Sequence, residues 1–361
     1  MPIVIDDLLR RVVERNASDL HLKVGSPPVI RVDGELERLD EFEPLKTTDT
    51  EALAAELFTA RAARDFKAAG QADFAYGKPD LGRFRVAAFR QRGSISMVMR
   101  RVVPGSPDFE ELGLPTAVRK LIENETPGIV LVTGPSGSGK TTTVASMVDW
   151  INENRAISIV TIEDPIEVLH PDKKAVVAQR EIGVDTLDYA SAVKAAMRQD
   201  ADVIVLSEIG DQETARAAIT AAETGHLVIS TMRTSDPAET ITRLVGYFPT
   251  SQHQMVRSQL AGLLKGIVSQ RLLESINGSG LVLATEVLVN NERVQEWIMS
   301  EQPTATLQEL IRESEFFGMQ TFDQSILRLV LSRHVDIDTA LPHVRNGHQL
   351  RAKAMEAGLL S

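Results

Sequence analysis

Residues 134–141 have the sequence Gly134-Pro-Ser-Gly-Ser-Gly-Lys140-Thr141, which fits the phosphate-loop pattern GxxxxGK(S/T). An apolar run at 128–132 precedes this sequence, and a helical pattern begins near Lys140. Glycines let backbone N–H groups curl around a phosphate without an obstructing Cβ, and a helix N-terminus adds partial positive charge. The pattern and its setting therefore predict a nucleotide-binding P-loop between a strand and a helix.

The same residues predict how a triphosphate and its metal are held. Lys140 is expected to reach the β- and γ-phosphate oxygens, and the Thr141 hydroxyl is expected to be a ligand of Mg²⁺. The expected ligands are therefore ATP and Mg²⁺, and hydrolysis of ATP is the expected reaction. The predicted binding residues are Gly134, Pro135, Ser136, Gly137, Ser138, Gly139, Lys140, Thr141 and Thr142.

On both sides of the loop, short apolar runs alternate with helical segments. Buried strands that are separated by crossover helices are typical of a parallel α/β sheet. The predicted strands are 129–132, 157–162, 203–206 and 227–230, and the predicted helices are 140–152, 188–197 and 211–224. The sequence thus predicts an α/β P-loop NTPase core with a mostly parallel sheet.

Carboxylates follow two of these predicted strands. Glu163 and Glu167 come after 157–162, and Glu208 comes after 203–206. Open α/β sheets bind ligands beyond the carboxyl ends of their strands, and a P-loop needs acids that hold Mg²⁺ and orient the attacking water. We therefore predict Glu163 and Glu208 near Mg²⁺. A solvated loop carboxylate is the alternative for each acid taken alone.

The regions before and after the core differ from it in character. Residues 1–102 combine a short amphipathic helix with β-rich pieces, which predicts an α+β domain. Residues 103–115 are rich in proline and glycine and are the predicted linker. The core is predicted to span 116–290, and 291–361 is predicted to form a C-terminal helical subdomain.

Composition narrows the possible functions. The 361 residues carry a formal net charge of −11, which disfavours broad affinity for nucleic acid. The chain has no cysteine, so thiolate catalysis and Cys-ligated zinc are excluded. Asp6 and Asp7 stand where a signal peptide would carry positive charge, and the apolar runs are too short to span a membrane. We expect a cytoplasmic protein without direct membrane insertion.

Four motifs resemble, in order, those of the type IV pilus and type II secretion ATPases. The P-loop resembles their Walker A motif, TIEDPIE (161–167) their Asp box, RQDADVIVLSEIGD (198–211) their Walker B motif, and AAETGHLVISTMRT (221–234) their His box. ASDLHLKVGSPPVIRVDGEL (17–36) and GMQTFDQSI (318–326) resemble the pilus retraction branch, the PilT-type ATPases of twitching motility.

This resemblance implies a homohexameric motor that powers type IV pilus retraction and works on an inner-membrane pilus platform protein. It implies a RecA-like core, a PAS-like N-terminal α+β domain, and a peripheral position at the inner face of the cytoplasmic membrane. Glu167 aligns with the glutamate that acts as base or orients water, and Glu208 aligns with the Walker B glutamate near Mg²⁺. His226 aligns with a histidine that senses the state of the nucleotide.

Arginines complete the set of predicted site residues. Arg83, Arg85 and Arg100 resemble family arginines that reach the phosphates from the N-terminal domain, and the alternative for each is a solvated position on a strand. The His box ends in Thr-Met-Arg-Thr where the family usually has Thr-Leu-His-Thr, and Gly210 stands where the family usually has arginine. We expect Arg233 to replace the missing positive charge and to act as a catalytic residue.

Other functions remain open at this point. A pilus-extension or type II secretion ATPase usually carries a four-cysteine zinc insert, which the cysteine-free sequence disfavours. A nucleotide-binding regulatory ring subunit with weak hydrolysis would fit the changes at Gly210 and Arg233. A nucleic-acid translocase is disfavoured by the acidic charge balance, so no nucleic-acid partner is expected.

Overall fold

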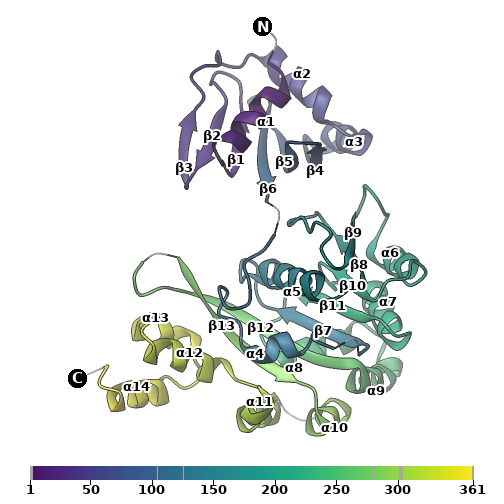
Figure 1. Cartoon of the computed structure of the whole chain (residues 1–361), viewed down its shortest axis with the longest axis vertical. Coiled ribbons are helices and arrows are strands. Elements are labelled where there is room, and N and C mark those ends of the chain that lie inside the picture. The colour runs from purple at the N-terminus through teal and green to yellow at the C-terminus, as the bar shows by residue number, and fades with distance from the viewer. Residues whose placement is uncertain (1–2, 104, 125, 279, 301–303, 360–361) are drawn as a thin grey trace. The chain divides into compact units, whose positions relative to one another are not determined.

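The chain forms two compact units. The computed structural model describes residues 3–103, 105–124, 126–278, 280–300 and 304–359 (Figure 1). The first unit comprises Met1–Pro104 with Pro165–Leu169, and the second comprises Gly105–Asp164 with His170–Ser361. Residues 165–167 of the predicted Asp box therefore group with the first unit.

In its described part, the first unit is an antiparallel sheet with the strand order β3-β2-β1-β6-β5-β4. The strands are β1 (Asp19–Leu22), β2 (Val29–Val32), β3 (Glu35–Arg38), β4 (Gln71–Lys78), β5 (Gly82–Gln91) and β6 (Ser94–Val102), and the helices are α1 (Ile5–Glu14), α2 (Thr47–Leu57) and α3 (Ala60–Ala69). Leu8 and Val12 recur on one face of α1 and are buried with Leu20 and Phe84. This apolar face holds α1 against the sheet, and the unit has the predicted α+β character.

The second unit is built on a mixed sheet with the strand order β13-β12-β7-β11-β10-β8-β9. Neighbouring strands from β12 to β9 are parallel, whereas β13 is antiparallel to β12. The strands are β7 (Gly128–Thr133), β8 (Ser158–Glu163), β9 (Val176–Glu181), β10 (Val203–Leu206), β11 (Leu227–Met232), β12 (Leu264–Glu274) and β13 (Leu281–Val289). This mostly parallel sheet confirms the predicted RecA-like α/β core.

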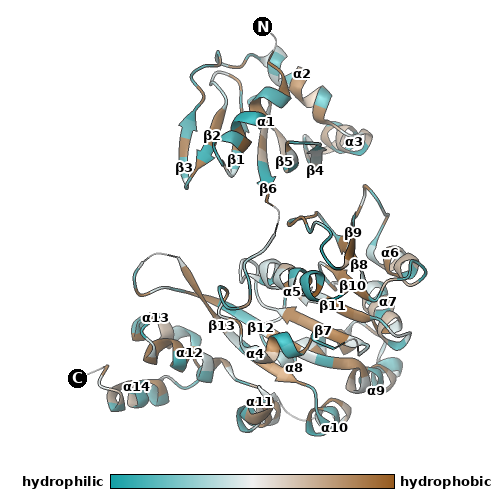
Figure 2. Ribbon diagram, viewed as in Figure 1, coloured by the Kyte–Doolittle hydropathy of each residue, from teal (hydrophilic) through white to brown (hydrophobic). Residues whose placement is uncertain are grey.

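Helices cover both faces of this sheet (Figure 1). They include α4 (Thr116–Lys120), α5 (Lys140–Asn154), α6 (Tyr189–Ala196), α7 (Gln212–Glu223), α8 (Pro237–Gly246) and α9 (His253–Leu263). Ile129 and Leu131 of β7 pack in one cluster with α6 and α7, whereas Val130 and Val132 pack in another with α5. Because successive side chains of a strand point to opposite faces and both faces are covered, the central strands are mostly apolar (Figure 2).

Most of the predicted linker packs within the second unit. Phe109 and Leu114 are buried in the cluster that contains the apolar side chains of α5. Ser106 Oγ donates a hydrogen bond to Asp149 Oδ2 at 2.8 Å. Pro104 lies outside the described residues. The limits of the domains stay a prediction, but residues 106–114 have the buried contacts of a packed segment.

Helices follow β13 in the C-terminal region. They are α10 (Glu292–Ser300), α11 (Thr304–Glu313), α12 (Phe322–Leu331), α13 (Ile337–Ala340) and α14 (Gly347–Glu356). Helix α12 packs against β13, and α13 packs against β12. Glu286 of β13 is 1 % exposed and accepts hydrogen bonds from Gln308 Nε2 at 2.6 Å and from the backbone N–H of Phe322 at 3.1 Å. Arg271 of β12 lies over the ring of Phe322, 4.1 Å from its centroid. A buried carboxylate and a cation–π contact thus join these helices to the sheet.

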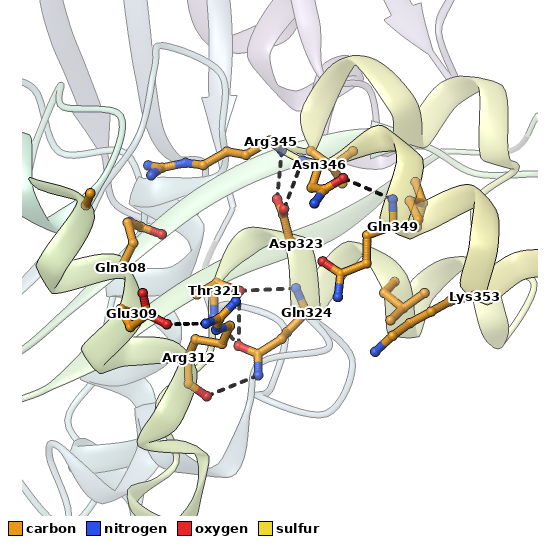
Figure 3. Close-up of a pocket in the computed structure, with 14 residues that line it drawn as sticks. Gln308, Glu309, Arg312, Thr321, Asp323, Gln324, Arg345, Asn346, Gln349 and Lys353 are labelled. Atoms are coloured by element: carbon orange, nitrogen blue, oxygen red, sulfur yellow. Dashed lines mark hydrogen bonds and ion pairs between the residues drawn. The ribbon is translucent and has the colours of Figure 1, made fainter.

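Helices α11, α12 and α14 line a cavity of about 470 Å³ (Figure 3). Many of its polar side chains bond to neighbours within the same helical region. Asp323 accepts hydrogen bonds from the backbone N–H groups of Arg345 and Asn346, at 2.9 and 3.2 Å, and Thr321 and Gln324 form a capping box at the start of α12. No P-loop residue lines this cavity. We therefore describe it as a junction between helices.

Candidate active site

The P-loop connects the end of β7 to the start of α5, where the sequence pattern placed it. Gly134, Gly137 and Gly139 have φ angles of +149°, +80° and +86°, which side chains rarely allow. A Cβ on Gly134 would lie 2.4 Å from Ser138 Oγ and 2.6 Å from the carbonyl oxygen of Gln270. The glycines therefore permit the tight turn that a phosphate cradle at a helix N-terminus requires.

Lys140 begins α5 and bends back over the loop. Its Nζ donates hydrogen bonds to the carbonyl oxygens of Gly134 and Pro135, at 2.8 Å each. Burial lowers the pKa of Lys140, as does the charge of Arg233, and the charge of Glu208 opposes both. Lys140, Arg233 and Glu208 therefore lie close enough to interact electrostatically, although they come from three separate segments.

The carboxylates lie at the same edge of the sheet as the P-loop. Strands β7, β11, β10 and β8 are parallel neighbours, so their carboxyl ends meet at one edge. Glu163 ends β8, and its Oε1 accepts hydrogen bonds from Thr161 Oγ1 at 2.6 Å and from Gln179 Nε2 at 3.0 Å. Glu208 follows β10. The structure thus brings Glu163 and Glu208 to the edge that carries the P-loop, and their roles stay a prediction.

Tyr189, which no sequence motif singles out, lies among these acids. Its hydroxyl oxygen is 2.6 Å from Ser207 Oγ. Burial raises the pKa of Tyr189 to about 12, against the hydrogen bond with Ser207, and the charges of Asp164, Glu208 and Glu163 raise it further. A neutral hydroxyl group therefore stands beside three carboxylates. The only signal in the sequence was the position of Tyr189 within a predicted helix.

Arg233 follows β11 and pairs with Glu208. Its Nε and Nη2 atoms lie 3.0 and 2.8 Å from Glu208 Oε2. The register of β11 and β7 pairs Met232 with Thr133, so Arg233 lies beside the start of the P-loop. Arg233 is therefore at the edge of the sheet that carries the P-loop, as its predicted replacement of the missing positive charge requires. Its guanidinium group forms an ion pair with a carboxylate.

His226 lies at the amino ends of the parallel strands, opposite the edge that carries the P-loop. It precedes β11, and its carbonyl oxygen accepts a hydrogen bond from the N–H of Gly128, at the start of β7. Its Nδ1 atom is 2.8 Å from the carbonyl oxygen of Ala221. The six residues of β11 separate His226 from Arg233, which corresponds to about 20 Å. Within one chain, the structure does not bring His226 to the P-loop, because a strand places its two ends at opposite edges.

The three predicted site arginines, all in the first unit, share one face of its sheet. Arg85 and Arg100 are directly paired across β5 and β6, and Arg83 is two residues from Arg85. Arg100 Nε donates to Asp19 Oδ1 at 2.8 Å, and Arg85 Nη1 donates to Glu167 Oε1 at 2.9 Å. These side chains therefore form a basic face whose charge is partly offset by carboxylates.

The residues at the P-loop edge fit a magnesium ion that is bound together with nucleotide phosphates. Mg²⁺ takes oxygen ligands, keeps several waters and uses only one or two protein carboxylates at phosphate sites. The Thr141 side chain is exposed in the first turn of α5, and the Glu208 side chain is 31 % exposed. One hydroxyl group and one accessible carboxylate are the donor set that such a site needs.

A P-loop at the carboxyl edge of a mostly parallel sheet, with carboxylates beyond neighbouring strands, defines a P-loop NTPase. Residues 1–339 match the family model described as type II/IV secretion system protein. The chain belongs to this family.

Its relatives place it in the pilus retraction branch. It is 40% identical to the type IV pilus retraction ATPase PilT of Pseudomonas aeruginosa, over 90% of this chain and 94% of that protein. It is 36% identical to a twitching motility protein of Neisseria gonorrhoeae, over 90% of this chain and 86% of that protein. The crystal structure of the pilus retraction motor PilT with bound ADP matches with a TM-score of 0.86 at 40% identity, over 97% of this chain and 99% of that chain. The predicted PilT-type ATPase is confirmed.

Proposed function

We propose that this chain is the ATP-hydrolysing motor of type IV pilus retraction and that it acts as a homohexameric ring. The observation that carries the proposal is the meeting of the P-loop, Glu163 and Glu208 at one edge of the sheet. It occurs in a chain that matches a retraction ATPase over 90% of its length. Nucleotide can drive motion of such a ring only through its different affinities for open and closed states of the subunits.

The residues at the P-loop edge have separate proposed roles. Lys140 leaves the carbonyl oxygens of its own loop and binds the β- and γ-phosphate oxygens. Thr141 and Glu208 hold Mg²⁺, with Glu163 beside it, at the end of β8, the strand that neighbours β10. When bound, Mg²⁺ would offset the negative charge on the β- and γ-phosphate oxygens. Tyr189 stays neutral near these carboxylates, and its hydroxyl group shares a hydrogen bond with Ser207.

The residues of the first unit act on the reacting phosphate in the assembled ring. Glu167 orients the attacking water, and Arg85 holds its carboxylate in the nucleotide-free chain. Arg83, Arg85 and Arg100 stabilise charge on the γ-phosphoryl group, because a planar donor with permanent charge suits that task. His226, at the far edge of the sheet, has no proposed contact with nucleotide inside its own chain.

The motor is proposed to work at the inner face of the cytoplasmic membrane, through the platform protein of the pilus machine. Among the described residues, no helix combines the length and the apolar character that crossing a bilayer requires. Attachment through a partner protein agrees with this finding and with the pilus ATPases among the relatives.

Deletion of the gene in its source organism tests whether the motor retracts or extends the pilus. Loss of a retraction motor should let surface filaments accumulate while twitching stops, whereas loss of an extension ATPase should remove the filaments. The wild-type gene should restore twitching, and the Lys140→Ala gene should not. A deletion strain that lacks surface filaments would contradict retraction.

The size of the purified protein tests the ring. With a non-hydrolysable ATP analogue, light scattering should give a mass near six subunits. A mass that stays that of one subunit at every protein and nucleotide concentration would contradict the ring, since the N-terminal arginines are proposed to act across subunits.

A further inference from the structure

Asp149, in the third turn of α5, forms a buried pair with His170. The two residues are 7 % and 8 % exposed, and His170 Nδ1 lies 2.7 Å from Asp149 Oδ1. Ser106 Oγ donates to Asp149 Oδ2 at 2.8 Å. Burial raises the pKa of Asp149, but hydrogen bonds from His170 and Ser106 and the charge of Lys173 outweigh burial and hold this pKa below its usual 3.8. The carboxylate is therefore ionised, and its two donors fix its position.

The same hydrogen-bond network continues to Glu163. The backbone N–H of His170 donates to Gln179 Oε1 at 2.8 Å. Gln179 Nε2 in turn donates to Glu163 Oε1 at 3.0 Å. Gln179 lies on β9, paired with Thr161 of the neighbouring β8. Direct hydrogen bonds thus connect the ionised Asp149 to a carboxylate at the P-loop edge.

Helix α5 links this hydrogen-bond network to the P-loop, because it carries both Lys140 and Asp149. Asp149 lies nine residues after Lys140, which is about 14 Å along the helix axis. A rigid-body shift of α5 at its phosphate-binding end would also move Asp149. Asn152 holds the same loop independently, since its Nδ2 donates to the carbonyl oxygen of Pro171 at 2.8 Å. The loop therefore stays attached to α5 without the Asp149–His170 pair.

We propose that Asp149 and His170 are positioning residues for ATP hydrolysis, which transmit the position of the phosphate-binding helix to Glu163. The inference rests on the proposed place of Glu163 beside Mg²⁺. Ser106 belongs to the predicted linker, residues 103–115, so a displacement of that segment acts on the same carboxylate. The linker and the P-loop are thereby coupled through Asp149.

Steady-state hydrolysis by the full-length His170→Ala protein tests this coupling. Loss of a residue that positions a metal-site carboxylate should lower kcat about 10-fold or more and change KM for ATP less than about 2-fold. His170→Asn keeps a donor toward Asp149 and should recover part of kcat. Adding Asp149→Asn to His170→Ala should cause little further loss, because both changes break one contact. An unchanged kcat, or fully additive losses, would overturn the proposal.

Amide hydrogen exchange tests the coupling without turnover, and so separates it from the proposed function. ADP should slow exchange at residues 161–163 of the parent protein, and His170→Ala should remove this protection while it still binds ADP. Equal protection in both proteins would overturn the coupling, whatever the rate of hydrolysis. His253→Ala is the matched control, because its ring Nε2 lies 2.9 Å from the carbonyl oxygen of Phe248, outside the network. It should change neither kcat nor protection.

Discussion

Arg233 contacts Glu208 through two nitrogens, Nε and Nη2, which lie 3.0 and 2.8 Å from the same carboxylate oxygen. The two side chains are 64 % and 31 % exposed, so water screens the pair and little free energy opposes an exchange of partners. We propose that Arg233 leaves Glu208 and faces the phosphates when nucleotide binds. The phosphate oxygens would then pair with Arg233, and Glu208 would be a ligand of Mg²⁺.

Arg233→Ala should lower kcat for ATP hydrolysis at least about 10-fold, because it removes a cation that would stabilise charge on the γ-phosphoryl group. Phosphate release at saturating MgATP measures this effect. The double variant Gly210→Arg/Arg233→His, which restores the residue types usual in the family, should keep more activity than Arg233→Ala.

Arg243→Ala is the matched control for that experiment. Arg243 is similarly exposed and pairs with a glutamate, Glu239, at 4.0 Å, but it lies on α8. Its removal should leave kcat within about 2-fold of the parent, since exposed pairs of this kind contribute little. If Arg233→Ala also leaves turnover unchanged, Arg233 has no catalytic role.

Lys140→Ala should weaken ATP binding about 100-fold or more, because a charge that pairs with the phosphates at a partly buried site is lost. Isothermal titration with a non-hydrolysable analogue measures the affinity. Lys194→Ala, which removes an exposed lysine of α6, controls for the change in net charge. Binding of the analogue by Lys140→Ala as tight as that of the parent would refute the P-loop interpretation.

Gly134→Ala and Gly137→Ala should differ in stability, although both glycines have positive φ angles. A Cβ at Gly134 meets Ser138 Oγ at 2.4 Å and the carbonyl oxygen of Gln270 at 2.6 Å, whereas a Cβ at Gly137 meets nothing within 4 Å. Backbone strain alone should cost about 1 kcal/mol at Gly137, and the added clash should cost about 3 kcal/mol at Gly134. Thermal unfolding of the two variants measures the difference, and equal midpoints would contradict it.

The P-loop and the strands around it could be predicted from the sequence, because their signals are local. Glycines at fixed spacing, an apolar strand before them and a helix after them identify the loop without any distant contact. The strand predicted at 203–206 has the bounds of β10, since strands that are buried on both faces form uninterrupted apolar runs. Parallel order then places Glu163 and Glu208 at one edge.

Edge strands and distant partners could not be predicted in the same way. Strand β9 lies at the edge of the sheet and alternates exposed and partly buried residues, so no apolar run marks it. Residues 47–69 form two helices, α2 and α3, because Phe58 is extended and Thr59 caps the second one. The Arg233–Glu208 pair and the place of Tyr189 depend on tertiary contacts between separate segments.

Glu286 should make the stability of the second unit depend on pH. Burial raises its pKa above the ordinary 4.5, against hydrogen bonds from Gln308 and from the backbone N–H of Phe322. A raised pKa in the folded state means that the protonated form is favoured there. The contribution of Glu286 to stability is therefore full below about pH 4.5 and is lost as the pH rises through its folded-state pKa.

Glu286→Gln removes the ionisable group. The unfolding midpoint of the variant minus that of the parent should therefore rise as the pH increases. Between pH 5 and pH 8 this difference should shift in favour of the variant, because only the parent loses the contribution of a buried protonated carboxyl group. Calorimetric melts at four pH values measure the trend. Glu356→Gln, the same change at an exposed position of α14, is the matched control. A difference that stays constant with pH would show that Glu286 keeps its charge in the folded protein, held by Gln308 and the N-terminus of α12.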